Sequence, residues 1–64
     1  MPIISDAIKL KCLEREIAMR RRVYPSWVRD GRMTQDHADR EISTMEAIAQ
    51  DYREKITQAN PTLL

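Results

Sequence analysis

The sequence contains no Phe, and its 64 residues include only one Gly, one Cys and one His. A single Cys excludes a disulfide within the chain, and one Cys with one His falls short of the four ligands that a structural zinc site usually has. No apolar run approaches the roughly 20 residues of a membrane-spanning helix. The opening residues 1–4 lack the basic start of a secretory signal. We therefore expect a cytoplasmic protein with no metal, no cofactor and no membrane contact.

The scarcity of Gly and Pro also bears on the fold class. Ala, Arg, Glu, Ile and Met are frequent and favour helices, and no window alternates apolar and polar residues as a half-buried strand does. We predict an all-α protein. A lone chain of this length buries too little surface to be comfortably stable, and without a disulfide or a metal its remaining means of stabilisation is self-association.

The first predicted helix covers about residues 5–24. Ser5 or Asp6 can cap its first turn, and Pro25 disfavours a helical conformation for Tyr24, the residue before it. Residues 25–33 then form a short helical corner. In this corner Pro occupies the first helical position, and Gly31 supplies the left-handed residue that ends the turn.

The second predicted helix covers about residues 35–59. Thr34 can cap its start, and Met33 and Ala38 have the spacing of a hydrophobic staple. Asn60 and Pro61 end the helical pattern. Because the corner is short, we expect the two helices to pack antiparallel, so that residues 1–64 form a single helical-hairpin domain.

The apolar residues predict which helix faces are buried. One narrow seam on the second helix comprises Ala38, Ile42, Met45, Ala49, Tyr52, Ile56 and Ala59. On the first helix, the apolar residues divide into two groups on nearly opposite sides at about 100° per residue. One group comprises Leu10, Leu13, Ile17 and Tyr24, and the other comprises Ile8, Cys12, Met19 and Val23.

One neighbouring helix cannot cover both groups of the first helix. We predict that the Leu10 group packs on the second helix of the same chain and that the Ile8 group packs on another chain. The result is a symmetric homodimer that forms a four-helix bundle, with Ile8, Cys12, Met19 and Val23 at the dimer interface. The alternative is that the second group is ordinary apolar surface.

Charge is divided unevenly along the chain. Residues 1–33 contain eight bases and four acids, and residues 34–64 contain three bases and six acids, so a net charge of +1 conceals two oppositely charged halves. Five bases lie near the predicted corner, beside Tyr24 and Trp27. The candidate partner-binding residues are Arg20, Arg21, Arg22, Trp27, Arg29 and Arg32.

Three interpretations of this basic corner remain open. Trp and Arg dominate the strongest contacts of protein interfaces, and such a cluster suits an acidic protein surface. Guanidinium groups also bind phosphate oxygens and aromatic rings stack on bases, which is typical of a nucleic-acid or nucleotide site. In the third interpretation Trp27 only covers the open end of the hairpin, and the arginines follow the preference of cations for helix C-termini.

The sequence offers little for catalysis. His37 is the one candidate general base, and it lies in the first turn of a predicted helix, where the helix dipole disfavours its charged form. Cys12 lies on an apolar face, as expected of a small core residue rather than a nucleophile. We predict that the protein is not an enzyme.

The stretch from Glu14 to Tyr52 contains "EREIAMRRRVYPSWVRDGRMT" and "ADREISTMEAIAQDY". It resembles small open reading frames of tailed bacteriophages and prophages, especially those of Pseudomonas and related bacteria, over about two thirds of the chain. The turn is also similar to that of short C-terminal oligomerisation modules. The phage resemblance implies a non-catalytic accessory protein that docks on a host enzyme, transcription regulator or defence complex and blocks or redirects it. A structural role in a phage assembly is a further possibility.

Overall fold

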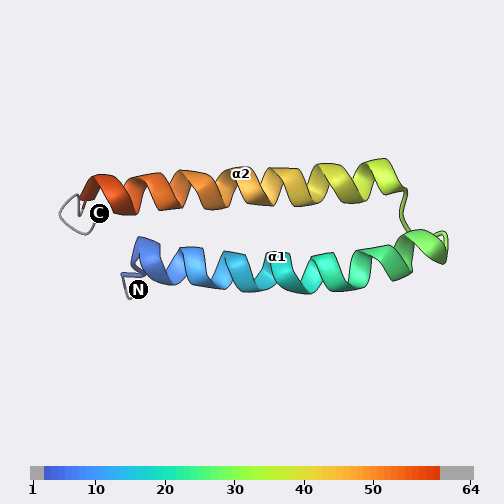
Figure 1. The fold of residues 1–64 in the computed structure, drawn as a ribbon. Coiled ribbons are helices and arrows are strands. Elements are labelled where there is room, and N and C mark those ends of the chain that lie inside the picture. Colours follow the sequence, from blue (N-terminus) through green and yellow to red (C-terminus); the bar gives the residue numbers. More distant parts are fainter. Residues whose placement is uncertain (1–2, 60–64) are drawn as a thin grey trace.

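The structure is a computed structural model that describes residues 3–59. It contains two helices, α1 (Asp6–Arg29) and α2 (Gln35–Ala59), which run antiparallel and lie side by side (Figure 1). The molecule is a rod with extents of 46 × 27 × 16 Å. The predictions of an all-α chain and of a helical hairpin are confirmed.

The start of α1 is the one that the sequence indicates. Ser5 has an extended backbone conformation, and its side-chain oxygen accepts a hydrogen bond from the backbone N–H of Ile8 at 3.2 Å. This bond satisfies one of the amide groups that have no partner in the first turn of a helix. Ser5, rather than Asp6, is therefore the N-cap residue.

The expected end of the first helix at Tyr24 is wrong, because α1 continues through Pro25 to Arg29. Proline lacks the N–H that would bond to the carbonyl one turn earlier, so the helix loses one backbone bond there. The ring of Pro25 lies at the surface, and the backbone N–H of Asp30 still donates to the carbonyl of Ser26 at 2.9 Å. Of the segment 25–33 that was expected to be a separate corner, residues 25–29 are thus the last part of α1, and residues 30–33 form the turn.

A Schellman motif ends α1. Gly31 has φ = +81°, its N–H donates to the carbonyl of Val28 at 3.1 Å, and the N–H of Arg32 donates to the carbonyl of Trp27 at 2.9 Å. The second helix, α2, begins at Gln35, four residues after Gly31. There the Thr34 hydroxyl accepts a hydrogen bond from the His37 N–H at 3.1 Å, which confirms the predicted cap.

Gly31→Ala is expected to lower the free energy of unfolding by about 1–2 kcal/mol. The reason is conformational, because no atom lies within 4 Å of the position that a Cβ would occupy, while the positive φ disfavours any L side chain. Urea denaturation followed by circular dichroism measures this loss. Gly31→Asn is the matched control, since Asn tolerates this conformation better, and equal losses for both variants would contradict the explanation.

The core lies along the line where the helices meet. Ile17 and Tyr24 of α1 and Ala38 and Ala49 of α2 are buried, with 0–6% of each residue exposed. The half-buried apolar residues beside them are Leu10, Leu13, Val28, Ile42, Met45, Tyr52 and Ile56. The Leu10 group therefore faces α2, as predicted. The α2 seam is as expected except at Ala59, which is exposed because it lies in the last turn, beyond the start of α1 (Figure 1).

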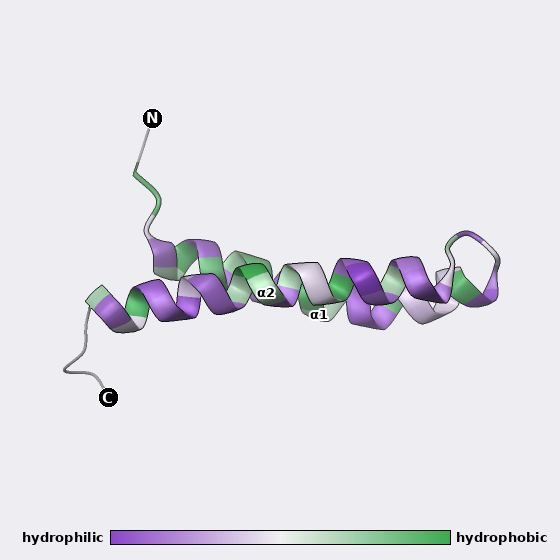
Figure 2. Cartoon of the chain, turned by 90° about the horizontal axis from the view of Figure 1, so that it is seen from above, coloured by the Kyte–Doolittle hydropathy of each residue, from purple (hydrophilic) through white to green (hydrophobic). Residues whose placement is uncertain are grey.

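Polar residues occupy most of the remaining surface. On α2 the hydrophobic segments are short and separated by hydrophilic ones (Figure 2). Ion pairs join the two helices: Arg21 Nη2 lies 2.8 Å from Glu46 Oε1, and Arg53 Nη2 lies 3.0 Å from Glu14 Oε2. Nearer the start of α1, Lys55 Nζ lies 3.9 Å from Asp6 Oδ2. These exposed pairs each contribute less than about 1 kcal/mol, and they favour one alignment of the helices.

Candidate interaction surfaces

The first candidate surface is the side of α1 turned away from α2. At about 100° per residue, Ile8, Cys12 and Met19 stand within about 40° of the direction opposite Ile17. The structure leaves 59% of Ile8 and 37% of Met19 exposed, and Cys12 is exposed as well. Val23 lies at the edge of this surface and is half-buried. The residues predicted for a dimer interface are thus exposed in the hairpin, apart from the half-buried Val23.

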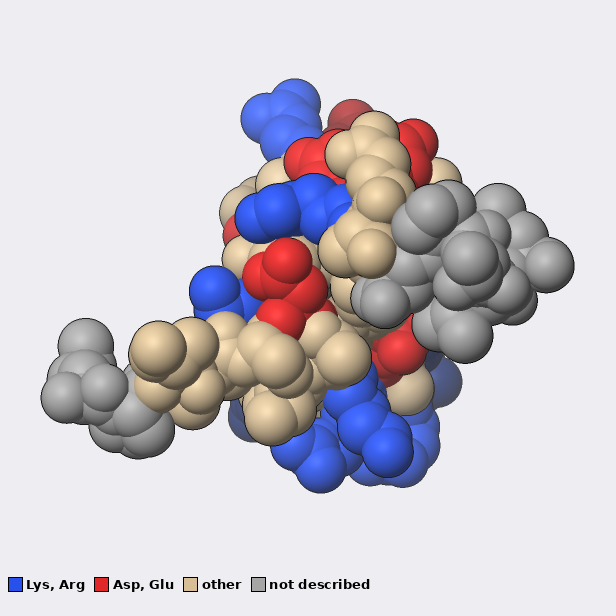
Figure 3. All heavy atoms as spheres, turned by 90° about the vertical axis from the view of Figure 1, so that its left-hand side faces the viewer, with Lys and Arg blue, Asp and Glu red and all other residues tan. Residues whose placement is uncertain are grey.

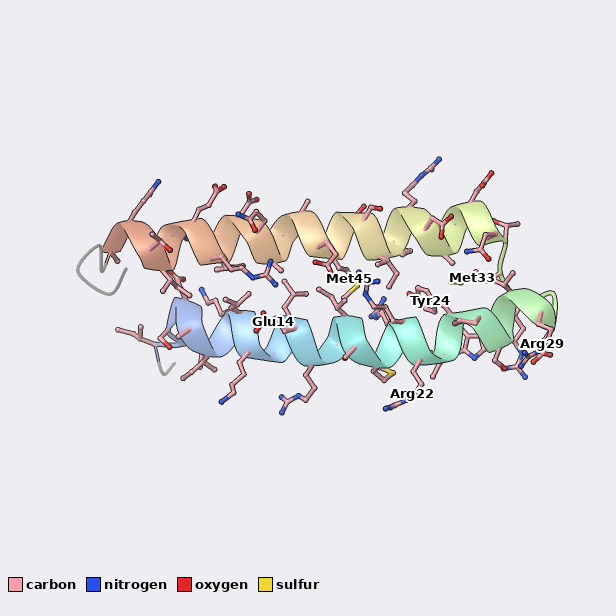
Figure 4. All side chains as sticks on the ribbon, in the orientation of Figure 1. Glu14, Arg22, Tyr24, Arg29, Met33 and Met45 are labelled. Atoms are coloured by element: carbon pink, nitrogen blue, oxygen red, sulfur yellow. The ribbon has the colours of Figure 1, made fainter. Side chains whose placement is uncertain are left out.

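A row of bases borders these apolar residues on one side. We call it the basic stripe, and it comprises Lys11, Arg15, Arg22 and Arg29. Arg22 and Arg29 point away from α2 (Figure 4), and the view along the hairpin shows Lys and Arg side chains gathered beneath α1 (Figure 3). All four residues are exposed, and none forms an ion pair with another residue among 3–59.

Arg20 and Arg21, in contrast, are bound within their own chain. Arg20 donates hydrogen bonds to the Tyr24 hydroxyl and to Glu16, each at 3.1 Å, and Arg21 is paired with Glu46. The contacts with Tyr24 and Glu16 raise the pKa of Arg20 above its usual value, so the guanidinium stays protonated. A partner that uses these two arginines must compete with contacts that already exist.

Trp27 lies on a different side of α1 from the basic stripe. Its ring centroid is 5.6 Å from that of Tyr24, with the ring planes inclined at 37°, and 39% of the residue is exposed. Arg32 lies in the turn after α1. The six residues predicted to bind a partner therefore do not form one surface. The structure groups Arg22 and Arg29 with the basic stripe, and it separates them from Arg20, Arg21 and Trp27.

The second candidate surface, which we call the mixed flank, is built from both helices. The angle of a residue around its helix can be measured from the line where the two helices meet. In an antiparallel pair, residues of the two helices that have the same angle in the same sense lie on the same side of the pair. By this geometry the ion pairs of Arg21 and Arg53 lie on one side of the hairpin. The apolar residues of the opposite side are Leu13, Val23 and Trp27 from α1 and Met45, Ile48 and Tyr52 from α2.

Sequence reasoning missed Ile48, which is 42% exposed. It does not belong to the seam that packs on α1. The sequence indicated its position only through its spacing, three residues after Met45 and four before Tyr52, which places all three on one side of a helix. The polar residues of this flank include Glu16 and Arg20, which bond to each other, and Lys9 and Lys55, whose amino groups lie 6.0 and 5.3 Å from the Tyr52 ring centroid.

The hollows on the surface of the hairpin are open to solvent. One of 390 Å³ lies near the turn and is lined by the apolar residues Tyr24, Pro25, Val28, Ala38 and Ile42 and by the polar residues Arg21, Gln35, Asp39 and Ser43. His37 Nε2 lies 3.5 Å from Glu41 Oε1 on the surface. Between Ile3 and Ala59, no three His, Cys, Asp or Glu side chains are grouped as metal ligands would be. Neither α1 nor α2 is long and apolar enough to cross a membrane.

Comparison with known proteins identifies no relative: no family model, curated protein or solved structure matches the chain.

Proposed function

We propose that this chain is a non-catalytic phage accessory protein that forms a homodimer and binds a host bacterial protein with an acidic surface, which it inhibits or redirects. The observation that carries the proposal is the amount of apolar surface outside the hairpin contact. Trp27, Ile48, Met19 and Ile8 are each at least 37% exposed, while only four residues among 3–59 are buried. Exposed apolar surface on so small a protein marks an interaction site.

The mixed flank fits the dimer better than the outer face of α1. If two copies met through Ile8, Cys12 and Met19 alone, the two α2 helices would lie far apart, and the four helices would form a single layer without a common core. A four-helix bundle needs inward-facing residues from every helix. The mixed flank supplies them, with Leu13 and Trp27 from α1 and Ile48 from α2.

The expected solution mass is twice the 7.5 kDa of the chain. Ile48→Asp is expected to shift the mass to that of a monomer, because it places a carboxylate in the proposed bundle core. Light scattering at about 100 μM measures the mass. Ala47→Asp adds the same charge one residue away, on the exposed side of α2, and should leave the dimer intact. A wild-type monomer, or equal effects of the two substitutions, would overturn the proposed dimer.

Binding to a host protein is tested by capture from a bacterial lysate, followed by reconstitution with the purified candidate. The expected result is one stoichiometric protein whose contact surface is acidic. If the chain retains no protein under conditions in which it is folded, the proposed host interaction is wrong. A change in the activity of the reconstituted candidate distinguishes inhibition from redirection.

The second candidate function is nucleic-acid or nucleotide binding at the corner, favoured by the exposed ring of Trp27 and by the exposed Arg32 in the turn that follows. Arg29 lies on a different side of α1 from Trp27. Arg20 and Arg21 weigh against it, because Glu16 and Glu46 already hold them. Titration of Trp27 fluorescence with duplex DNA, RNA and nucleotides at low salt tests this alternative. Quenching that weakens as salt is added would favour it over the protein-binding function.

A further inference from the structure

We propose that the outer face of α1 binds an amphipathic helix of a partner protein whose apolar stripe is bordered by Asp and Glu. This inference rests on the proposed function, because it names the chemistry of the host partner. The apolar part of the face comprises Ile8, Cys12 and Met19, with Val23 at its edge, and the basic stripe is its charged border. The acidic partner helix would lie along α1, on the side opposite α2.

Charge complementarity selects an acidic partner. The four bases of the stripe are exposed, and no described residue neutralises them, whereas Arg20, Arg21, Arg53 and Lys55 all have acidic neighbours in their own chain. Asp30 follows Arg29 directly in the chain, and it forms no ion pair with any of the four bases. Carboxylates from outside the chain are the groups that this border lacks.

The dimensions of the face suit a helix. The face spans 22 residues from Ile8 to Arg29, which is a rise of about 32 Å at 1.5 Å per step. Ile8, Cys12, Arg15, Met19, Arg22 and Ser26 alternate in spacings of four and three, which is the periodicity of helix-to-helix packing. A basic amphipathic face of this kind is typical of helices that dock on an acidic protein partner.

A second copy of the chain is a poorer occupant. In an antiparallel α1 to α1 contact, the two basic stripes would lie on the same side and repel each other. In a parallel contact, each stripe would face the opposite border of the other copy. The acid there is Glu16, which is already bound to Arg20 at 3.1 Å.

Phosphate or lipid surfaces also fit less well. The stripe lies on one side of the apolar residues only, whereas helices that rest on anionic membranes carry bases throughout a broad polar face. The four apolar residues beside the bases would make no contact with a phosphate backbone. A partner with both an apolar stripe and an acidic border on one side uses both features.

The test uses the full chain and a fluorescent 21-residue peptide designed as an amphipathic helix, with Leu on one stripe and Glu beside it. Fluorescence anisotropy at low salt should show saturable binding. Arg15→Glu combined with Arg22→Glu should weaken this binding at least tenfold. Arg40→Glu combined with Ala47→Glu and Gln58→Glu makes the same change in net charge on the side of α2 turned away from α1, and should change the affinity less than twofold. Circular dichroism establishes that both charge variants are folded.

Three outcomes would overturn the inference. They are equal loss of affinity in both charge variants, equal binding of a peptide with Lys in place of Glu, and tighter binding to duplex DNA or to phosphatidylserine vesicles than to the peptide. The proposed function is tested separately by capture from lysate. If the Arg15 and Arg22 double variant retains the same host protein as the wild type, the inference fails while the proposed function stands.

Discussion

Ala49→Leu is expected to lower the free energy of unfolding of the hairpin by about 1–3 kcal/mol, or to abolish the cooperative unfolding transition altogether. Ala49 has 0% exposure and lies in the middle of the contact between α1 and α2, so the added atoms have no space unless the helices separate. A domain of this size has a total stability of roughly 3–10 kcal/mol. The loss is therefore a large fraction of the whole.

Ala47→Leu is the matched control for this prediction. Ala47 is exposed on the same helix two residues earlier, so the identical change adds side-chain volume without crowding α1. Leu has nearly the helix propensity of Ala, and the stability should change by less than about 0.5 kcal/mol. Thermal denaturation followed by circular dichroism compares the two variants. If they lose stability equally, close helix packing at Ala49 is not the cause.

Tyr24→Ala has the second large effect that we expect. Tyr24 is 6% exposed, it contacts the Trp27 ring, and its hydroxyl accepts a hydrogen bond from Arg20. Removing a buried aromatic ring costs about 3–5 kcal/mol, because the transfer free energy is lost and a cavity is left. Chemical denaturation gives the loss. The emission of Trp27, the single Trp, reports on the change in its surroundings.

Tyr24→Phe separates the ring from the hydroxyl. It keeps the apolar volume and removes only the bond from Arg20, so the expected loss is about 0.5–1.5 kcal/mol. A loss as large as that of Tyr24→Ala would mean that the polar contact, and not burial of the ring, stabilises this end of the hairpin. A loss near zero would show that Arg20 is equally well bound by Glu16 alone.

Most of the fold could be predicted from the sequence because the signals that define it are local. Thr34, Gly31 and Ser5 act through bonds that span three to five residues, which a sequence pattern contains in full. The α2 seam was predictable because Ala38, Ala49 and their neighbours repeat at helical spacing. Pro25 was misjudged because its cost to α1 is one backbone bond. The burial of Tyr24, which depends on packing against α2, and the Schellman motif at Gly31 outweigh the loss of that bond.

The candidate surfaces were less predictable, because they depend on how the helices are aligned. Arg21 and Glu46 are 25 positions apart, so nothing in the sequence showed that Arg21 is already paired while Arg22 is not. Clustering in sequence suggested one basic corner from Arg20 to Arg32. Successive helix residues point in directions about 100° apart, and the structure therefore distributes these bases over several sides of α1.

The alignment of the helices has a consequence for the order of folding. Arg21 pairs with Glu46 and Glu14 pairs with Arg53, and both pairs are centred on the same point of the chain, just before Thr34. The smallest loop that can close is the turn around Gly31, and every later contact adds little further loss of chain entropy. We therefore expect the contacts between α1 and α2 to form first at the turn and then toward the open end of the hairpin. The folding rate should then depend most on the residues from Tyr24 to Ala38.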